Sequence, residues 1–328
     1  MSGTFDAYRI FEDGKAGRGA IIPVSPGELD EGDVLVRTLY AGVNYKDALA
    51  GTGRGRIVRR YPCIGGIEAV GIVEQSETPA VPVGATVILH GYGMGVDRDG
   101  GLSPWVRVPG AFATLLPEGL NPLHAAAIGV AGHTSALALE LMELNGLRPG
   151  NGPVAVTGAT GGTGSLAVAL LAGAGYEVVA VSRKADAADY LRRIGAAAVM
   201  APPERLETAK PLESARWAGA VDTAGGWLLD WLIRTMRNDG VIGAFGNTAG
   251  LDLQTSILPF ILRGVRLLGV NADTRPPQRE KIWDRLATGL NPRFIDDMVH
   301  VISLHDLPAF MEDMVAGTTK GRTLVQFA

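Results

Sequence analysis

The sequence predicts an α/β protein with two domains, one built on a doubly wound parallel sheet and one rich in β-strands. Two observations lead to this fold class. Between Tyr8 and Val108, short β-type runs are broken by Gly, Pro and Asp, which is typical of an all-β or partly open barrel domain. From about residue 121 to residue 264, strand-like and helical runs alternate, which is typical of a parallel sheet covered by helices.

The domain boundaries follow from where these patterns change. Helical periodicity takes over at Pro122 to Asn145, with three alanines in a row and the run LALELMEL. The last segment returns to strand-like runs, VRLLGVN and RTLVQF, around two helical stretches, Pro276 to Thr288 and Leu304 to Val315. We expect this segment to rejoin the first domain. The predicted division is a β-rich domain of residues 1–120 and 265–328 with residues 121–264 inserted.

The elements of the inserted domain can be placed in order. Runs of four to eight apolar, often β-branched residues indicate buried strands, and longer apolar runs indicate helices. We expect strands in VAVTG, EVVAV, AAVM, AGAVDTAG and VIGAFG, and helices over Ser165–Ala172, Ala185–Ile194 and Trp227–Arg237.

The most informative stretch is Pro153 to Gly175, PVAVTGATGGTGSLAVALLAGAG. Its apolar run, glycine-dense turn and second apolar run predict a strand, a loop and a helix, with no regular structure from Gly158 to Gly164. Glycines let a backbone approach a pyrophosphate closely, and the start of the helix attracts the anion. The spacing G-x-x-G-G-x-G differs from the usual G-x-G-x-x-G. An ordinary glycine-rich turn is therefore the alternative to a dinucleotide site.

The end of the next strand addresses the choice of cofactor. In a Rossmann unit, the residue about 20 positions beyond the loop meets the adenosine ribose, and Asp or Glu there favours NAD. In this chain Ser182, Arg183 and Lys184 follow the strand EVVAV. A hydroxyl and two cations suit the 2′-phosphate of NADPH. The alternative is a solvated strand end with incidental charge.

Composition limits the classes of partner. The 30 basic and 34 acidic residues give a net charge of −4 without a basic block, so we expect small-molecule partners and no nucleic acid. The N-terminus has no apolar signal region and no stretch resembles a membrane span. One cysteine, Cys63, excludes an intramolecular disulfide. We expect a cytoplasmic protein that forms a homodimer and makes no membrane contact.

Several motifs together carry a resemblance to a known family. They are Asn44-Tyr45-Lys46-Asp47, Gly65-Gly66-Ile67-Glu68 with Gly71, Gly158 to Gly164, Ala220 to Thr223, PFILRGV at Pro259 to Val265, and Gly321 to Val325. The chain resembles the medium-chain dehydrogenase/reductase superfamily and, within it, the quinone-oxidoreductase-like acryloyl-CoA reductases of the AcuI/YhdH branch. The resemblance implies a GroES-like catalytic domain that the C-terminus completes and a Rossmann domain that binds NADPH.

A zinc ion is not expected, although many members of the superfamily bind one. Zinc-dependent members use Cys and His ligands, including the His of a Gly-His-Glu motif, which here reads Gly66-Ile67-Glu68. Zn²⁺ needs three or four closely placed N, S or O ligands. Cys63 has no partner cysteine, and the five histidines are scattered. We expect no metal.

Without a metal, the expected chemistry is hydride transfer to an activated C=C bond. Such a site must hold the alkene against the nicotinamide and stabilise the carbonyl oxygen with fixed donors. The resemblance places NYKD beside the nicotinamide, so Asn44 and Tyr45 are the candidate catalytic residues. For Asn44 the alternative is an ordinary N-cap of the helical stretch that follows, with Asp47 three residues on.

An arginine cluster is the candidate substrate site. Arg54, Arg56, Arg59 and Arg60 lie within seven positions, and a guanidinium can bind two phosphate oxygens at once. Arg54 and Arg56, with Arg322 of the GRTLV motif, are the candidate contacts to the phosphates of CoA. A solvated basic loop or a contact to the NADPH 2′-phosphate are the alternatives.

The candidate cofactor residues come from several strand ends. Gly246 and Asn247 follow the strand VIGAF, and Thr134 lies near the start of the long helix, where a cap is the alternative role. The full set is Thr134, Gly158, Thr160, Gly161, Gly162, Thr163, Ser182, Arg183, Gly246, Asn247 and Asn271.

The sequence therefore predicts an NADPH-dependent enzyme that reduces a short 2-enoyl-CoA, with acryloyl-CoA to propanoyl-CoA as the expected reaction. The first alternative is an NADPH:quinone oxidoreductase, which shares the fold and cofactor and has no need of the arginines. The second is a non-catalytic NADPH-binding protein.

Overall fold

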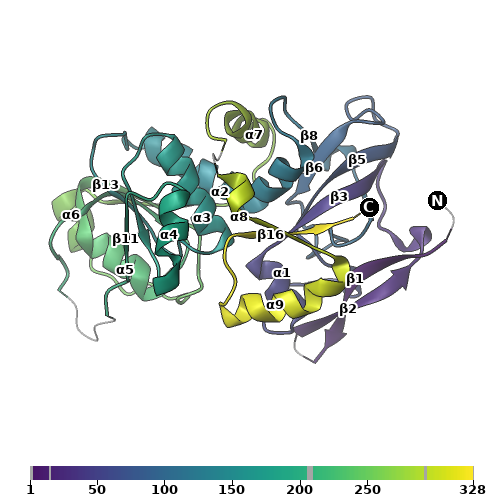
Figure 1. The fold of residues 1–328 in the computed structure, drawn as a ribbon, viewed down its shortest axis with the longest axis horizontal. Helices are drawn as coiled ribbons and strands as arrows, with labels where there is room; N and C mark the ends of the chain where they lie inside the picture. Colours follow the sequence, from purple (N-terminus) through teal and green to yellow (C-terminus); the bar gives the residue numbers. More distant parts are fainter. Residues whose placement is uncertain (1–2, 15, 205–209, 292–293, 328) are drawn as a thin grey trace. The chain divides into compact units, whose positions relative to one another are not determined.

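The computed structural model describes residues 3–14, 16–204, 210–291 and 294–327. The chain forms two compact units, which we describe separately (Figure 1). Unit 1 contains Met1–Val130, Asp273–Glu280 and Met298–Ala328, and unit 2 contains Ala131–Ala272 and Lys281–Asp297.

Unit 2 is built on a six-stranded parallel sheet. The strands, in spatial order, are β11 (Ala198–Met200), β10 (Val178–Val181), β9 (Val154–Val156), β12 (Trp217–Asp222), β13 (Met236–Ala244) and β14 (Arg266–Gly269). The first strand in the chain lies inside the sheet, and the order reverses between β9 and β12, as in a Rossmann fold. The predicted doubly wound sheet is confirmed.

The helices of unit 2 follow the strands along the chain. They are α3 (Gly162–Gly173), α4 (Ala188–Arg193), α5 (Gly226–Thr235), α6 (Leu258–Arg263), α7 (Gln278–Thr288) and the short α8 (Ile295–Met298). Helix α7 begins in unit 1, and the last residue of α8 belongs to unit 1. A core that includes Val179, Ala220, Leu232, Ile242 and Val265 packs between the sheet and helices α5 and α6.

Four features of unit 2 differ from the sequence predictions. Helix α3 already begins at Gly162, so regular structure enters the stretch expected to lack it; the first N–H groups of a helix need no intrahelical partner, which makes glycine tolerable there. Arg237 lies in β13 instead of the preceding helix. The short helix α6 was not predicted. The sheet continues through β14, beyond the boundary expected at residue 264.

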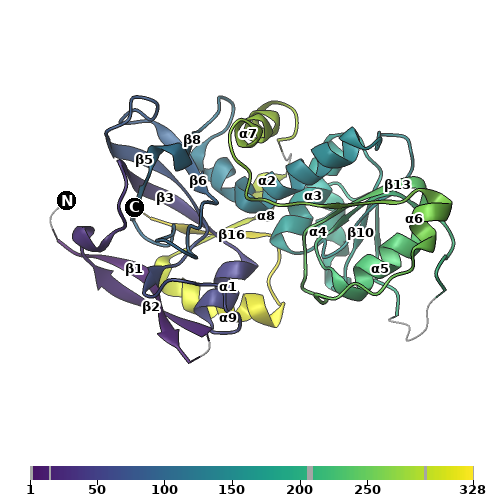
Figure 2. The same cartoon turned by 180° about the vertical axis from the view of Figure 1, so that it is seen from behind.

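Unit 1 contains two sheets. The larger has seven strands: β15 (Val299–Ile302), β16 (Arg322–Gln326), β3 (Val34–Val43), β5 (Glu68–Ser76), β6 (Thr86–His90) and β8 (Ala113–Leu115) in that order, with β7 (Trp105–Val108) also on β3. The smaller has the order β2 (Ala16–Val24), β1 (Phe5–Asp13) and β4 (Cys63–Ile64). Strand β16 pairs antiparallel with β3, so the C-terminal segment completes the larger sheet (Figure 2).

Two helices of unit 1 share a core with the sheets. Helix α1 (Tyr45–Gly51) contacts α9 (Leu307–Ala316), as Figure 2 also shows. Their buried side chains include Ala48 and Met311, which join Tyr8, Ile10 and Val43 in one cluster. This packing fixes the start of α1, where the motif NYKD lies.

Helix α2 (Pro122–Leu144) corrects one sequence prediction. Among the described residues it is long and apolar enough to cross a membrane by length and composition, although no such stretch was expected. Its most apolar window is 89% buried inside the protein, which is typical of the core helix of a globular protein. Its helical geometry breaks at Gly129, where φ is 47° and ψ is −156°.

Candidate functional site

The glycine loop joins β9 to α3 and is shaped for a close approach of an anion. Gly158 is exposed and has φ of 58°, which favours glycine. A Cβ on Gly164 would lie 2.2 Å from the carbonyl oxygen of Gly158, so the loop can fold back onto α3 only with glycine there. Gly161 is exposed at the start of α3. The helix therefore presents its first N–H groups to an open surface, and the loop fits a bound pyrophosphate.

A buried carboxylate ties this loop to the neighbouring strand end. The Thr157 hydroxyl donates to Asp222 Oδ1 at 2.7 Å, and the N–H of Gly225 donates to Asp222 Oδ2 at 2.8 Å. The Thr223 hydroxyl in turn donates to the carbonyl of Thr157 at 2.7 Å. Burial raises the pKa of Asp222, while the hydrogen bonds that its carboxylate accepts from Thr157, Gly225 and Ala224 oppose the rise. The ends of β9 and β12 are thus held together beneath the loop.

Ser182, Arg183 and Lys184 lie directly beyond β10, as predicted. The N–H of Lys184 donates to Ser182 Oγ at 3.1 Å, which closes a small turn. Arg183 is exposed and makes no ion pair with any residue that the structure describes. Its guanidinium can therefore bind a phosphate at the edge of the sheet where the glycine loop lies.

The remaining candidate cofactor residues divide into two groups. Gly246 follows β13 and packs against Thr223, where a Cβ would lie 1.9 Å from the backbone, so Gly246 and the exposed Asn247 join the same edge of the sheet as the glycine loop. Asn271, beyond β14, is also exposed. Thr134, Thr160 and Thr163 differ from these: Thr134 and Thr160 are buried, and Thr163 is half-buried.

In unit 1, the two candidate catalytic residues differ in whether their polar groups are free to bind a ligand. Asn44 Nδ2 donates to Glu68 Oε1 at 2.8 Å, and Asn44 Oδ1 accepts from Arg322 at 3.1 Å. Both ends of its amide are therefore occupied. Tyr45 is 37% exposed, and its hydroxyl has no hydrogen bond to another described residue. Of the pair, only Tyr45 keeps a free donor for a ligand, so Asn44 is better assigned to holding the start of α1.

Asp47 completes the start of α1. Its carboxylate accepts from the N–H of Asn44 at 2.9 Å and from the N–H of Ile67 at 3.1 Å. Burial raises the pKa of Asp47 to about 7, and the charge of Glu68 contributes to the rise against the two hydrogen bonds. Asp47 therefore changes charge near neutral pH.

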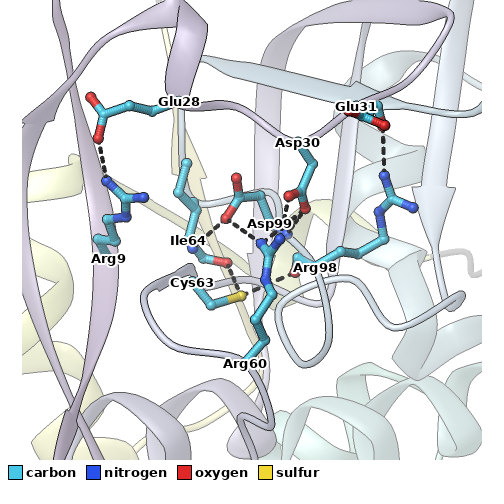
Figure 3. A network of polar contacts seen from close by, with 9 residues as sticks. All are labelled: Arg9, Glu28, Asp30, Glu31, Arg60, Cys63, Ile64, Arg98 and Asp99. Carbon is cyan, nitrogen blue, oxygen red and sulfur yellow. Dashed lines mark hydrogen bonds and ion pairs between the residues drawn. The ribbon is translucent and has the colours of Figure 1, made fainter.

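The arginine cluster is not a set of four free cations. Arg59 pairs with Asp97 at 3.5 Å, and Arg60 binds Asp30 and Asp99 in the network of Figure 3. Arg54 pairs with Glu312 at 2.8 Å, although both side chains are about half exposed. Arg56 is exposed and has no carboxylate partner among the described residues. Only Arg56 is thus fully open to a phosphate.

Arg322 also needs correction as a candidate CoA contact. Its side chain is 2% exposed, and its guanidinium donates to Glu68, Asn44 and backbone carbonyls of three residues. The sequence missed this because the acceptors come from segments far apart in the chain. Arg322 has no donor left for a phosphate.

The side chains that could act as metal ligands do not fit a zinc ion. No three His, Cys, Asp or Glu side chains cluster as metal ligands within the described part of the chain. Cys63 is buried, its Sγ donates to the carbonyl of Arg98 at 3.1 Å (Figure 3), and burial raises the pKa of the thiol to about 12. A thiol that stays protonated is a poor ligand, and Glu68 is already paired with Arg322.

Comparison with known proteins agrees with this fold and site. A family model described as "Alcohol dehydrogenase GroES-like domain" matches residues 30–118, and one described as "Zinc-binding dehydrogenase" matches residues 162–288. The chain belongs to the medium-chain dehydrogenase/reductase family. It is 41% identical, over 96% of its length and 97% of the relative, to "Probable acrylyl-CoA reductase AcuI" from Escherichia coli. It is 40% identical, over 92% and 93% of the two chains, to "Putative quinone oxidoreductase YhfP" from Bacillus subtilis.

Solved structures resemble the whole chain as well. The yhdH oxidoreductase from Salmonella enterica, in complex with NADP, has a TM-score of 0.95 and 39% identity, covering 98% of this chain and 100% of its own. The Bacillus subtilis protein yhfP, with NAD bound, has a TM-score of 0.95 and 38% identity, covering 99% and 100%. The fold predicted from the sequence, and the family it resembles, are both confirmed.

Proposed function

We propose that the protein uses NADPH to reduce the C=C bond of a short 2-enoyl-CoA, with acryloyl-CoA as substrate and propanoyl-CoA as product. The observation that carries the proposal is the match over nearly the whole chain to a protein named as an acrylyl-CoA reductase. Two features of this chain's own residues support it. Arg183 offers an unpaired cation to the ribose phosphate, and Arg56 offers another to a phosphate of CoA.

The residues of unit 2 would hold the cofactor. The loop from Gly158 to Gly164 would bind the pyrophosphate through backbone N–H groups, and Ser182 and Arg183 would bind the 2′-phosphate. Gly246 and Asn247 would approach the cofactor at the next strand end. NADPH, when bound, supplies the hydride that adds to the carbon β to the thioester carbonyl, while the α carbon takes a proton.

The residues of unit 1 would hold the substrate. Tyr45 has a free hydroxyl that can donate a hydrogen bond to the thioester oxygen, where negative charge develops during hydride addition. Such a donor contributes only if it is fixed before the reaction, and the bonds around Asn44 and Asp47 fix the first turn of α1 that carries Tyr45. No metal is needed for this chemistry, and we propose that the enzyme works without zinc.

A second candidate function is the reduction of a quinone by NADPH, which the match to "Putative quinone oxidoreductase YhfP" from Bacillus subtilis favours. The deciding experiment measures NADPH oxidation by the purified protein with acryloyl-CoA, crotonyl-CoA and a small quinone side by side. We expect the highest kcat/KM with acryloyl-CoA. A higher kcat/KM with the quinone would assign the second function.

We further propose that the enzyme is a cytoplasmic homodimer. Support for self-association comes from the region of α6, where Ile257, Ile261 and Leu262 are 65%, 65% and 61% exposed. Exposed apolar groups of this kind mark contact surfaces. Light scattering after size-exclusion chromatography should give twice the mass of one chain, and a monomer at micromolar concentration would refute the dimer.

A further inference from the structure

Helix α2 is interrupted in a way that creates two helix ends inside the protein. At Gly129, φ is 47° and ψ is −156°, so the carbonyls before it and the N–H groups after it lose their helical partners. A Cβ on Gly129 would lie 2.2 Å from Glu68 Oε2. The break is therefore built around the Glu68 carboxylate and requires glycine.

A buried ion pair occupies the break and caps both ends. Arg322 Nε donates to the carbonyl of Ala127 at 2.9 Å and Nη2 to that of Ala126 at 3.4 Å, which places a cation at the C-terminus of the first segment. Glu68 Oε2 accepts from the N–H of Val130, which places an anion at the N-terminus of the second. Both charges have the sign that the helix dipoles favour.

The same two side chains reach the start of α1. Arg322 Nη2 donates to Glu68 Oε1 at 2.6 Å, and Asn44 binds both partners through its amide. Asn44 is the N-cap residue of α1, and Tyr45 is the first residue of that helix. The Glu68 and Arg322 side chains are 4% and 2% exposed, so the pair is almost completely buried. Asn44 is therefore the side chain through which the pair can act on Tyr45.

We infer that Glu68 and Arg322 are positioning residues for Tyr45, in addition to capping the broken helix. The inference rests on the proposed reductase function, in which Tyr45 donates to the substrate oxygen. A stabilising role alone is a weak explanation for the pair, because a buried ion pair loses much of its attraction to desolvation and apolar replacements are often as stable. A fixed polar frame at the N-cap of α1 is what apolar side chains cannot supply.

The test compares Glu68→Met, Arg322→Met and the double variant by thermal melting and steady-state kinetics. Each single variant leaves one buried charge unpaired, so we expect the double variant to melt at a higher temperature than either. We expect kcat to fall about ten- to a hundredfold in all three, because Tyr45 is displaced in each. KM for acryloyl-CoA and Kd for NADPH should change about threefold or less, since both side chains of the pair are almost completely buried.

If both kcat and the melting temperature recover in the double variant, the inference is overturned and the pair has a purely structural role. The control is Arg37→Met/Glu74→Met, which removes a partly exposed ion pair from β3 and β5 of the same sheet and should leave kcat unchanged. Wild type and variants are assayed with acryloyl-CoA and with a quinone. A wild type that turns over only the quinone would refute the proposed substrate, while the quinone kcat values would still decide the role of the pair.

Discussion

Replacing Arg56 by Ala tests whether the exposed arginine of the TGRGRI segment binds CoA. Arg56 has no carboxylate partner among the described residues, so its removal frees no other charge and any loss reflects a ligand. A charge-assisted hydrogen bond contributes about 1.5–3 kcal/mol, which corresponds to about a ten- to hundredfold loss of kcat/KM. Screening at an exposed site favours the lower end of that range. The contact is remote from the reacting carbons, so KM should rise more than kcat falls.

The matched control is Arg59→Ala, three residues further along the same loop. Arg59 is 76% exposed and already pairs with Asp97, so its loss should change KM for acryloyl-CoA by less than the loss of Arg56. Both variants and the wild type are assayed with acryloyl-CoA and a small quinone at two salt concentrations. Raising the salt should weaken CoA binding by the wild type more than by Arg56→Ala. Equal effects of Arg56→Ala on the two substrates would refute the CoA contact.

Three further predictions concern the cofactor, metal and pH. Ser182→Asp should weaken NADPH binding by about 1–3 kcal/mol in a fluorescence titration, because its charge opposes the 2′-phosphate; a wild type that binds NADH equally well would contradict this. Prolonged chelation should leave activity intact, whereas stoichiometric zinc whose removal abolishes activity would contradict the ligand argument. Asp47 keeps its proton in the folded state up to a pKa of about 7 but loses it near pH 3.8 when unfolded. Its contribution to the free energy of unfolding therefore falls between about pH 4 and 7, by up to about 1.4 kcal/mol per unit. Urea unfolding at pH 5 and 7 should show a smaller decrease for Asp47→Asn than for wild type; equal decreases would refute the assignment.

The features of unit 2 were largely predictable from the sequence because they depend on neighbouring residues. An apolar run followed by glycines that need positive φ specifies β9, the loop and α3 within one short stretch. The place of Ser182, Arg183 and Lys184 directly after β10 was predicted from their distance along the chain from the glycine loop. Local patterns did not predict the short helix α6, because its apolar residues LPFIL fit a buried strand as well as a helix.

The arrangement of unit 1 was much less predictable. Asp30, Asp97 and Glu312 neutralise three of the four arginines, yet they lie between about 30 and 260 positions from them in the chain. From the sequence, Arg322 of the GRTLV motif was a candidate CoA contact, but β16 carries it into the sheet beside β3, where its side chain is buried. Charge patterning along a sequence reports which side chains exist and not which partners neutralise them.

This difference between the units has a consequence for assigning function. Cofactor recognition depends on the backbone shape at strand ends, which a short motif encodes. The same motif can therefore occur in relatives that act on different substrates. In the proposed function, substrate recognition depends on which charges in unit 1 remain unpaired, and that property singles out Arg56 among the four arginines of the cluster. Two relatives of about 40% identity are named for an enoyl-CoA and for a quinone activity, so the family cannot decide between them. The response of KM to Arg56→Ala can decide between the two activities, because a CoA substrate carries phosphates and a quinone carries none.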